Sequence, residues 1–467
     1  MNVEQQANSE AIYGIAPMLK SERTMGFWDI TFITGIYALA PWCFTQGGYI
    51  ASLLGIKAAI TNIIGVIIVF SLLYLLTVVI PTRHGIDIWI YQRATFGYKG
   101  LTVLWFIVIG TTWGWEAILA RIYASSVAGL ITSFTGAPVS ESIIPWLGAT
   151  CILLGGFLAI LGPDVVRKIS YVAVPGVLFV CAVILFVVFS NYSIADLVAL
   201  KPTASSGDFR SDYMLATEWN LAFVCAWYAV LGVLPRMVKT ERKSYWGFMT
   251  GFGLIYALIV CVGAFGAIGL SGILGVTNPD PAAWLLGIGG WVGPLSLLLL
   301  ALSNISIMAV AMYSLSVSTK VINPEWNYRK IVGVWTVWCL ILNFWGAIWT
   351  YYPMFLAVIG FIGGPAVIII LADFFIVRKQ KLSMSSMYHQ TEKNAYYYTG
   401  GFNLIGIASL IGGAIAYFAV YDPINLVARN MLFNITTGTG LSCIVAGLIY
   451  ILVGSTKPGK AYLLRDR

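Results

Sequence analysis

Charged side chains are scarce in this sequence. Of its 467 residues, 10% are Asp, Glu, Lys or Arg and 59% are hydrophobic, whereas a soluble globular domain carries about 25% charged residues. The mean hydropathy is +0.86. A chain this long and this apolar cannot hide its hydrophobic surface in one water-soluble core, so we expect it to use lipid as its solvent.

Motifs that are typical of several classes of enzyme and pump are also missing. The two histidines, His84 and His389, lie in predicted loops, and the sequence has no HExxH motif, no paired acidic cluster at helical spacing and no glycine-rich phosphate loop. The sequence therefore lacks the residues that a membrane metalloenzyme or an ATP-driven pump would need. We predict a protein that is not an enzyme, with no catalytic residue and no cofactor or metal beyond a coupling ion.

Cysteine usage and the N-terminus add two expectations. The polar first 23 residues contain no apolar h-region, so no cleavable signal peptide is expected. The cysteines are far apart, form no CxxC pair and fall in apolar segments, which favours small buried hydrophobes over disulfides or metal ligands. They are Cys43, Cys151, Cys181, Cys225, Cys261, Cys339 and Cys443.

Long apolar runs dominate what is present. Twelve runs are long enough to cross a bilayer, which takes about 20 residues, and they are continuous rather than alternating, which favours helices over barrel strands. We predict spans 1 to 12 at 27–54, 58–80, 101–130, 142–162, 169–190, 218–235, 245–274, 292–318, 329–350, 353–377, 402–421 and 428–453.

The basic residues orient these spans. With the N-terminus inside, 22 of the 27 Lys and Arg residues fall in cytoplasmic segments, and four fall outside, namely Lys57, Lys201, Arg210 and Arg429. This is a strong positive-inside signal. It accounts for the net charge of +8 without a nucleic-acid partner. We predict a multi-pass protein of the cell (inner or plasma) membrane with both termini cytoplasmic, for which a monomer suffices.

Two spans contain helix-breaking residues. Span 1 contains Gly35 to Pro41 and then Gly47-Gly48, and span 6 contains Gly232 to Pro235. Spans 1 and 6 are corresponding members of two five-helix halves, and interrupted helices at matching positions indicate the central site of a transporter. Freed carbonyls can hold a cation, and free N–H groups can hold a polar ligand edge. The alternative is a simple proline kink.

Span 3 carries an acidic side chain at membrane depth. The run is Thr111-Thr112-Trp113-Gly114-Trp115-Glu116, followed by Arg121. A carboxylate at this depth costs several kcal/mol unless it is paired or hydrated, so Glu116 is a candidate functional residue. The alternative is a structural ion pair with Arg121. Five helical residues turn about 500°, which leaves the two side chains about 140° apart.

Aromatic and small polar residues complete the candidates. Trp113, Trp115 and Trp227 offer faces that stack on flat heterocycles or attract cations, although most of the 17 tryptophans should serve interfacial belts or packing. Trp227 is the stronger candidate because it precedes the span 6 break by about one turn. In span 8, Ser303-Asn304-Ile305-Ser306 either completes a cation site or joins helices together.

Several ordered strings carry a family resemblance from about Gly26 to Leu452. They are Pro41 with Thr45-Gln46-Gly47-Gly48, Tyr91-Gln92-Arg93-Ala94-Thr95-Phe96-Gly97, Trp227 eight residues before Pro235, and Ala372-Asp373-Phe374-Phe375-Ile376-Val377-Arg378-Lys379 with Leu382, Tyr388, Tyr398, Gly401, Phe402 and Asn403. With these strings the chain resembles the nucleobase:cation symporter-1 family of hydantoin, allantoin, cytosine and related permeases.

The resemblance implies an all-α, twelve-helix membrane protein with a leucine-transporter-like 5+5 inverted repeat and discontinuous helices 1 and 6. We expect an N-terminal tail at 1–26, repeats at 27–190 and 218–377, helices 11 and 12 at 402–453 and a C-terminal tail at 454–467.

The resemblance also implies a substrate site between a span 3 Trp and a span 6 Trp. Trp227 matches the second, whereas the first falls on Thr112, so Trp113 or Trp115 substitutes for it. The usual span 3 amide falls on Glu116 and the usual span 8 Asn on Met308, and Leu39 is expected in the same site.

The sodium ligands of the family fall on the carbonyls of Gly35, Ala38 and Leu299 and on the side chains of Leu302 and Ser303. Leu302 cannot ligate, so one of two hydroxyls is lost and the sodium site is in question.

These residues predict a symporter that imports a small nitrogen heterocycle, such as a nucleobase, a hydantoin-like compound or a pyrimidine vitamin, coupled to Na⁺ or H⁺. A carboxylate only accepts hydrogen bonds, so Glu116 either receives N–H groups of an amino-substituted or protonated ring, or is the proton site. The alternative is an amino-acid or amine permease of the same fold, in which Glu116 binds an ammonium group. A channel is disfavoured because no repeated polar rings are present.

Overall fold

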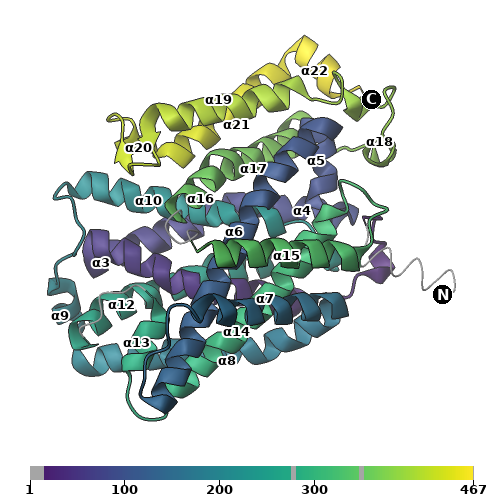
Figure 1. Cartoon of the computed structure of the whole chain (residues 1–467). Coiled ribbons are helices and arrows are strands. Elements are labelled where there is room, and N and C mark those ends of the chain that lie inside the picture. Colours follow the sequence, from purple (N-terminus) through teal and green to yellow (C-terminus); the bar gives the residue numbers. More distant parts are fainter. Residues whose placement is uncertain (1–14, 275–279, 347–351, 466–467) are drawn as a thin grey trace.

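The computed structural model describes residues 15–274, 280–346 and 352–465, which form a bundle of helices (Figure 1). Large apolar side chains on its outer surface are exposed, for example Phe106 (60%) and Phe157 (59%), as lipid-facing residues are. Within the described residues, eight helical stretches are long and apolar enough to cross a membrane. They are Pro41–His84, Tyr98–Thr135, Ile144–Leu161, Ala173–Asn191, Glu241–Leu270, Val292–Thr319, Leu356–Val377 and Gly438–Ser455.

The first half of the described chain contains helices for spans 1 to 6. Span 1 is α2 (Phe27–Ala38) and the start of α3 (Pro41–Tyr74), and span 2 is the rest of α3 with η2 (Leu75–Val78) and α4 (Val79–His84). Spans 3 to 6 are α6 (Tyr98–Thr135), α7 (Ile144–Leu161), α8 (Pro163–Asn191), and α10 (Phe209–Cys225) followed by η3 (Ala226–Val230).

The second half contains helices for spans 7 to 12. Span 7 joins α11 (Glu241–Phe248), the π-helical η5 (Met249–Ile255) and α12 (Tyr256–Leu274), and span 10 joins α16 (Tyr352–Val358), η7 (Ile359–Gly363), α17 (Gly364–Leu371) and η8 (Ala372–Val377). The others are α14 (Val292–Thr319), α15 (Tyr328–Trp345), α19 (Leu404–Val420) and α21 (Gly438–Ser455).

Short elements connect the spans. Figure 1 shows α4, α5 (Ile88–Phe96), α18 (Met384–Tyr388) and α22 (Lys457–Leu463) at one end of the bundle, and α9 (Ile194–Ala199), α13 (Pro281–Gly287) and α20 (Phe433–Thr436) at the other. Segments predicted to share a side of the membrane therefore lie at the same end. The remaining elements are η1 (Lys20–Glu22), η4 (Pro235–Met237), η9 (Ala395–Tyr397) and the antiparallel strands β1 (Tyr421–Asp422) and β2 (Val427–Ala428).

The predicted starts of spans 6 and 12 and the loop position of His84 were wrong, and part of span 9, residues 347–350, lies outside the described residues. The helix of span 6 begins at Phe209 rather than 218, because the Asp208 side chain caps it by accepting from two backbone N–H groups. Span 12 begins at Gly438 rather than 428, after the β hairpin and α20. His84 is the last residue of helix α4, not a loop residue.

The predicted break in span 1 is confirmed. Helix α2 ends at Ala38, Ala40 is extended with φ −62° and ψ 142°, and α3 starts at Pro41. Proline suits a first helical position because it lacks the N–H that would have no partner there. Gly55, with φ 69° and ψ 168°, then ends span 1 and starts span 2. The interruption is thus a change of backbone path between two half-helices.

The break in span 6 is also confirmed. After Cys225 the chain tightens into the 3₁₀ helix η3 and then runs through turns from 231 to 234. A Cβ at Gly232 would lie 1.8 Å from Oδ1 of Asp87, so only glycine permits this approach. The Asp87 carboxylate itself accepts from the Trp89 N–H at 3.0 Å and the Ser318 hydroxyl at 3.1 Å.

A close crossing holds span 1 against span 7. A Cβ added at Gly47 would lie 1.9 Å from the Val260 carbonyl oxygen, and one at Gly263 would lie 2.3 Å from the Phe44 carbonyl oxygen. Small residues on facing helices let membrane helices approach this closely. The glycine of the string Thr45-Gln46-Gly47-Gly48 is therefore a packing requirement beside the break.

Another string of the resemblance forms a buried polar network. The Asp373 carboxylate accepts hydrogen bonds from Tyr91 (2.9 Å), Thr95 (3.1 Å) and Tyr450 (2.7 Å), and from Nε of Arg378 at 3.0 Å. These residues come from α5, η8 and α21. The network joins the end of span 10 to the segment after span 2 and to span 12. The residues of this string are therefore needed for the fold.

The seven cysteines are free and buried, as predicted.

We expect Gly47→Ala to disrupt the crossing of spans 1 and 7, because the three atoms nearest to the added Cβ are all backbone atoms of span 7 and cannot rotate away. Overpacking of this kind costs about 1–3 kcal/mol, so the variant should lose folded protein and melt at a lower temperature in detergent. Gly65→Ala is the matched control, since nothing lies within 4 Å of a Cβ there. Equal melting temperatures for the two variants would contradict this packing.

Candidate substrate site

A small cavity lies between the two interrupted helices. Its free volume is about 30 Å³, the space of about one water molecule, so its walls must part to admit a ring. It is lined by residues of spans 1, 3 and 6, which are Tyr37, Trp42, Thr112, Trp115, Glu116, Phe223, Ala226, Trp227 and Val230. Both breaks therefore contribute to one site.

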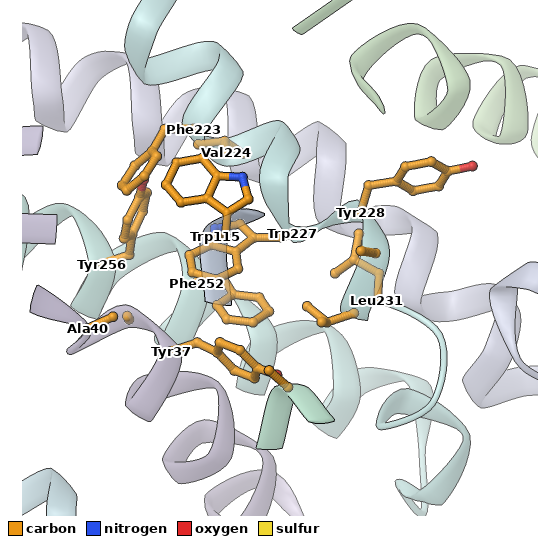
Figure 2. Packing of buried hydrophobic residues seen from close by; sticks show 14 of the residues in the cluster. Tyr37, Ala40, Trp115, Phe223, Val224, Trp227, Tyr228, Leu231, Phe252 and Tyr256 are labelled. Carbon is orange, nitrogen blue, oxygen red and sulfur yellow. The ribbon is translucent and has the colours of Figure 1, made fainter. Parts of the chain in front are cut away.

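Trp227 is held by aromatic rings on three sides. Phe252 of η5 stacks on its indole with ring centres 4.1 Å apart and an interplanar angle of 8°. Tyr37 and Tyr256 meet it edge-on at 5.9 Å and 5.4 Å. Figure 2 shows these rings gathered together, while Tyr228 points away from them. Because Phe252 covers one face of the indole, the other face is the one available to a ligand.

The structure separates the two span 3 tryptophans. Trp115 lines the cavity, where its ring lies 5.8 Å from Trp42 and 5.5 Å from Phe223. Trp113 instead stacks on Trp335 of α15, with ring centres 4.8 Å apart at 19°, and is not part of the cavity wall. Of the two candidates, Trp115 is in a position to meet a ligand and Trp113 is in a helix–helix contact.

Glu116 faces the cavity without a cationic partner in the described residues. Its side chain is 3% exposed, and its Oε2 atom has no hydrogen bond to any part of the chain that the structure describes. Arg121 pairs with Glu141 at 2.9 Å instead. The structural ion pair between Glu116 and Arg121 is therefore not formed, as the angle of about 140° between them on the helix indicated.

The other buried carboxylates named above or below differ from Glu116 in their hydrogen bonding. Those of Asp87, Asp212, Glu218 and Asp373 each accept at least two hydrogen bonds. A buried acidic side chain that serves only the fold is normally satisfied in this way. The unsatisfied oxygen of Glu116 thus points to a ligand or a proton.

Two further polar groups lie beside it. The Trp227 Nε1 atom is buried and makes no hydrogen bond within the described residues. The Tyr37 hydroxyl interacts electrostatically with Glu116 and lies near Ser314 of α14. The cavity therefore combines aromatic faces with a carboxylate acceptor, an indole N–H donor and hydroxyl groups.

The residues predicted to bind a cation are placed less favourably. Gly35 and Ala38 lie in the last turn of α2, where the Gly35 carbonyl already accepts from the Leu39 N–H at 2.8 Å. Ser303 donates to the carbonyl of Leu300 in its own helix at 2.9 Å. The described residues contain no group of His, Cys, Asp and Glu that could hold a metal ion.

The side chains of the two span 8 leucines make other contacts; the ligand predicted at Leu299 is its backbone carbonyl, not its side chain. Leu302 is 45% exposed on the outer surface. The Leu299 side chain packs against Gly176 of α8, where a Cβ would be 3.0 Å from it. The Leu302 side chain therefore faces lipid, and the Leu299 side chain faces helix α8.

Two predicted substrate contacts lie outside the cavity wall as described. Met308 packs against α7, where its Cγ atom would be 2.2 Å from a Cβ at Gly155. Leu39 is buried at the break itself, as the C-cap of α2. Thr112 lines the cavity, and its hydroxyl donates to the Val108 carbonyl at 2.7 Å.

Sequence reasoning missed much of the aromatic wall. Tyr37 and Trp42 flank the span 1 break and Phe223 precedes Trp227 by one turn, so their closeness to the predicted breaks was a usable signal. Phe252 had no such signal. It reaches Trp227 from the π-helical segment of span 7, where Gly251 and Gly253 flank it.

Two interrupted helices that enclose an aromatic cavity inside a twelve-helix bundle define a secondary transporter of the leucine-transporter type. A family described as permeases for cytosine/purines, uracil, thiamine and allantoin matches residues 17–444. The chain belongs to this family, the nucleobase:cation symporters.

Individual relatives are distant. The chain is 20% identical to the purine-uracil permease NCS1 of Arabidopsis thaliana, over 94% of this chain and 77% of the relative. It is 21% identical to the hydantoin permease of Microbacterium maritypicum, over 90% and 84%. Its fold is similar to Mhp1 in a closed conformation with bromovinylhydantoin bound, with a TM-score of 0.74, 18% identity and 97% and 96% coverage.

We expect Trp115→Leu and Trp227→Leu to raise the KM for substrate, because loss of one aromatic stack on a base costs about 1–3 kcal/mol. Trp113→Leu should reduce the amount of folded protein and leave KM unchanged. Initial uptake rates, normalised to folded transporter, measure both effects. A KM that rises equally in the Trp113 variant would contradict the placement of the cavity.

Proposed function

We propose that this permease imports a small, flat nitrogen heterocycle by alternating access and is coupled to H⁺ at Glu116. The observation that carries the proposal is the unsatisfied Glu116 oxygen beside the indoles of Trp115 and Trp227. The permease activity is inferred from family membership, and the chemical class of the ligand is inferred from the residues that line the cavity.

The cavity favours a ring with polar edges. The Trp227 face opposite Phe252 and the Trp115 ring suit an aromatic ligand. The indole N–H donates only, and Glu116 supplies an acceptor. A ring with a carbonyl and an adjacent N–H or amino group satisfies both, as in cytosine-like, aminopurine-like and vitamin-pyrimidine compounds.

Protonation of Glu116 gives the coupling step. A protonated carboxyl group both donates and accepts, as the amide that the family resemblance implies at this position does. Uptake of a proton would therefore create the pattern that recognises the ring edge, and its loss would weaken that pattern. Among the described residues, Tyr37 from α2, Cys151 from α7 and Cys339 from α15 lie close enough to Glu116 for an electrostatic interaction, and none of these three is a cation.

The alternative coupling ion, Na⁺, fits these residues less well. Of the two predicted side-chain ligands, Leu302 has no oxygen and is exposed on the outer surface, and Ser303 bonds to its own helix. Hard cations such as Na⁺ are held by several oxygen ligands at once, as in other cation sites built from carbonyls and hydroxyls.

Membrane placement follows from the charges. We propose a location in the cell (inner or plasma) membrane with both termini in the cytoplasm, because the segments that carry most Lys and Arg gather at the end of the bundle that holds α4, α5, α18 and α22. We also propose five-helix repeats at 27–190 and 209–377, the second starting where α10 begins, and a monomer as the working unit.

Glu116→Gln separates binding from coupling in proteoliposomes. The variant permanently presents the donor-and-acceptor pattern, so we expect it to exchange labelled substrate across the membrane but not to accumulate it when a pH gradient is applied. Wild type should accumulate substrate when the outside is acidic. A panel of purines, pyrimidines, hydantoins and pyrimidine vitamins identifies the substrate.

The exposed Glu141→Gln, whose side chain is 84% exposed, is the control for loss of a negative charge. If Glu116→Gln still accumulates substrate along the pH gradient, Glu116 does not carry the proton. If the variant no longer binds any compound, the ionised carboxylate is the recognition group instead.

A second candidate is an amine permease, because an unpaired carboxylate beside indole faces also suits an ammonium group. Competition decides between them: amines and amino acids should not displace a nucleobase-type ligand if the first proposal holds.

A further inference from the structure

A second carboxylate is buried in span 6, on the half-helix that leads to the cavity. Glu218 of α10 is 2% exposed and precedes Trp227 by nine residues. Its Oε2 atom accepts from the Thr439 backbone N–H at 2.8 Å and its Oε1 atom accepts from the Thr439 hydroxyl at 2.7 Å. Both carboxylate oxygens are thus directed at one residue of another helix.

Thr439 is the second residue of α21, the helix of span 12. N–H groups in the first turn of a helix have no partner within that helix and carry partial positive charge. The negative charge of the Glu218 carboxylate is stabilised by this partial positive charge, and its two oxygens accept from the Thr439 N–H and hydroxyl. Glu218 therefore joins α10 to the beginning of α21.

Close packing continues this contact toward the cavity. Glu218, Ala222 and Cys225 recur at helical spacing on one face of α10. A Cβ at Gly360 of η7 would lie 2.5 Å from the Thr439 hydroxyl and 3.6 Å from Cβ of Ala222. This face of α10 is thus held between span 10 and span 12 without room for larger side chains.

The contact ends at a pair of thiols just before the span 6 break. A Cβ at Gly364 of α17 would lie 3.0 Å from Sγ of Cys225 and 3.0 Å from Sγ of Cys443. The two sulfur atoms are therefore no more than about twice that distance apart, on α10 and α21. They can report whether the two helices stay together.

Another polar contact holds α10 against span 1. The Gln46 amide donates to Asn220 at 3.2 Å, and the Asn220 amide donates to Asn62 at 2.9 Å. Helix α10 is thus fixed to α3 through one set of residues and to α21 through Glu218. Beyond Cys225 the chain leaves α-helical geometry, so the position of α10 decides where Trp227 stands.

We propose that Glu218 is a positioning residue for substrate binding: its hydrogen bonds to the N-terminus of α21 hold α10, and with it Trp227, in place at the cavity. Helices α19 and α21 pack side by side (Figure 1) and lie outside the two five-helix repeats. They serve as the fixed support of the span 6 half-helix. The inference rests on the proposed function in one respect, namely that Trp227 stacks on the substrate.

Glu218→Leu tests the proposal, because it keeps a similar side-chain size and removes both acceptors to which Thr439 donates. A glutamine would not do so, since the Thr439 hydroxyl can turn and accept from its NH₂ group. We expect KM to rise about tenfold while the maximal rate per folded transporter is kept. Thr439→Val removes only the hydroxyl and should raise KM about threefold, whereas Thr439→Ser retains both donors and should behave as wild type. Glu141→Gln is the charge-loss control.

Cross-linking gives a readout that needs no substrate. In a background without the other five cysteines, Hg²⁺ should bridge Cys225 and Cys443, and Glu218→Leu should reduce the yield of the bridged protein. An unchanged KM with or without a change in cross-linking, or a raised KM with unchanged cross-linking, would overturn the proposal. If Trp227→Leu leaves KM unaltered, the proposed function fails, while the cross-link still reports the contact between α10 and α21.

Discussion

The fold depends on one constraint: inside a bilayer every backbone N–H and C=O must find a partner within the protein. This chain meets it with helices almost everywhere and leaves α-helical geometry at Leu39–Ala40 and at 226–234. Both breaks are enclosed by other spans, where Gly47 and Gly263 bring span 7 against the first and Gly232 lets Asp87 approach the second. Irregular backbone thus occurs where it forms the wall of a cavity.

Buried charge follows the same logic. Asp373 is satisfied by an arginine and three hydroxyls, Asp87 by a backbone N–H and a serine, and Glu218 by the beginning of a helix. These carboxylates join elements that are distant in the sequence, so they hold the scaffold together. Glu116 has no comparable partner for Oε2 among the described residues. This difference is the basis of the proposal that Glu116 serves transport, whereas the other three acids serve the fold.

Much of this organisation could be predicted from the sequence, since continuous apolar runs locate the spans and Pro41 and Gly232–Pro235 locate the breaks. The choice between Trp113 and Trp115 could not, because helix geometry puts them about 80° to either side of the direction shared by Thr112 and Glu116. Only the neighbouring Trp335 and Trp42 decide it. Phe252 reaches Trp227 from another helix, and Leu302 faces outward. Such relations depend on how helices are rotated against each other.

The most direct test of the account is a structure of the protein in lipid with its transported heterocycle bound. We predict density for a flat ring between Trp115 and the uncovered face of Trp227, with a ring N–H or amino group directed at Glu116 and both half-helix breaks preserved. A ring bound elsewhere, or continuous first and sixth helices with Glu116 turned toward lipid, would contradict it.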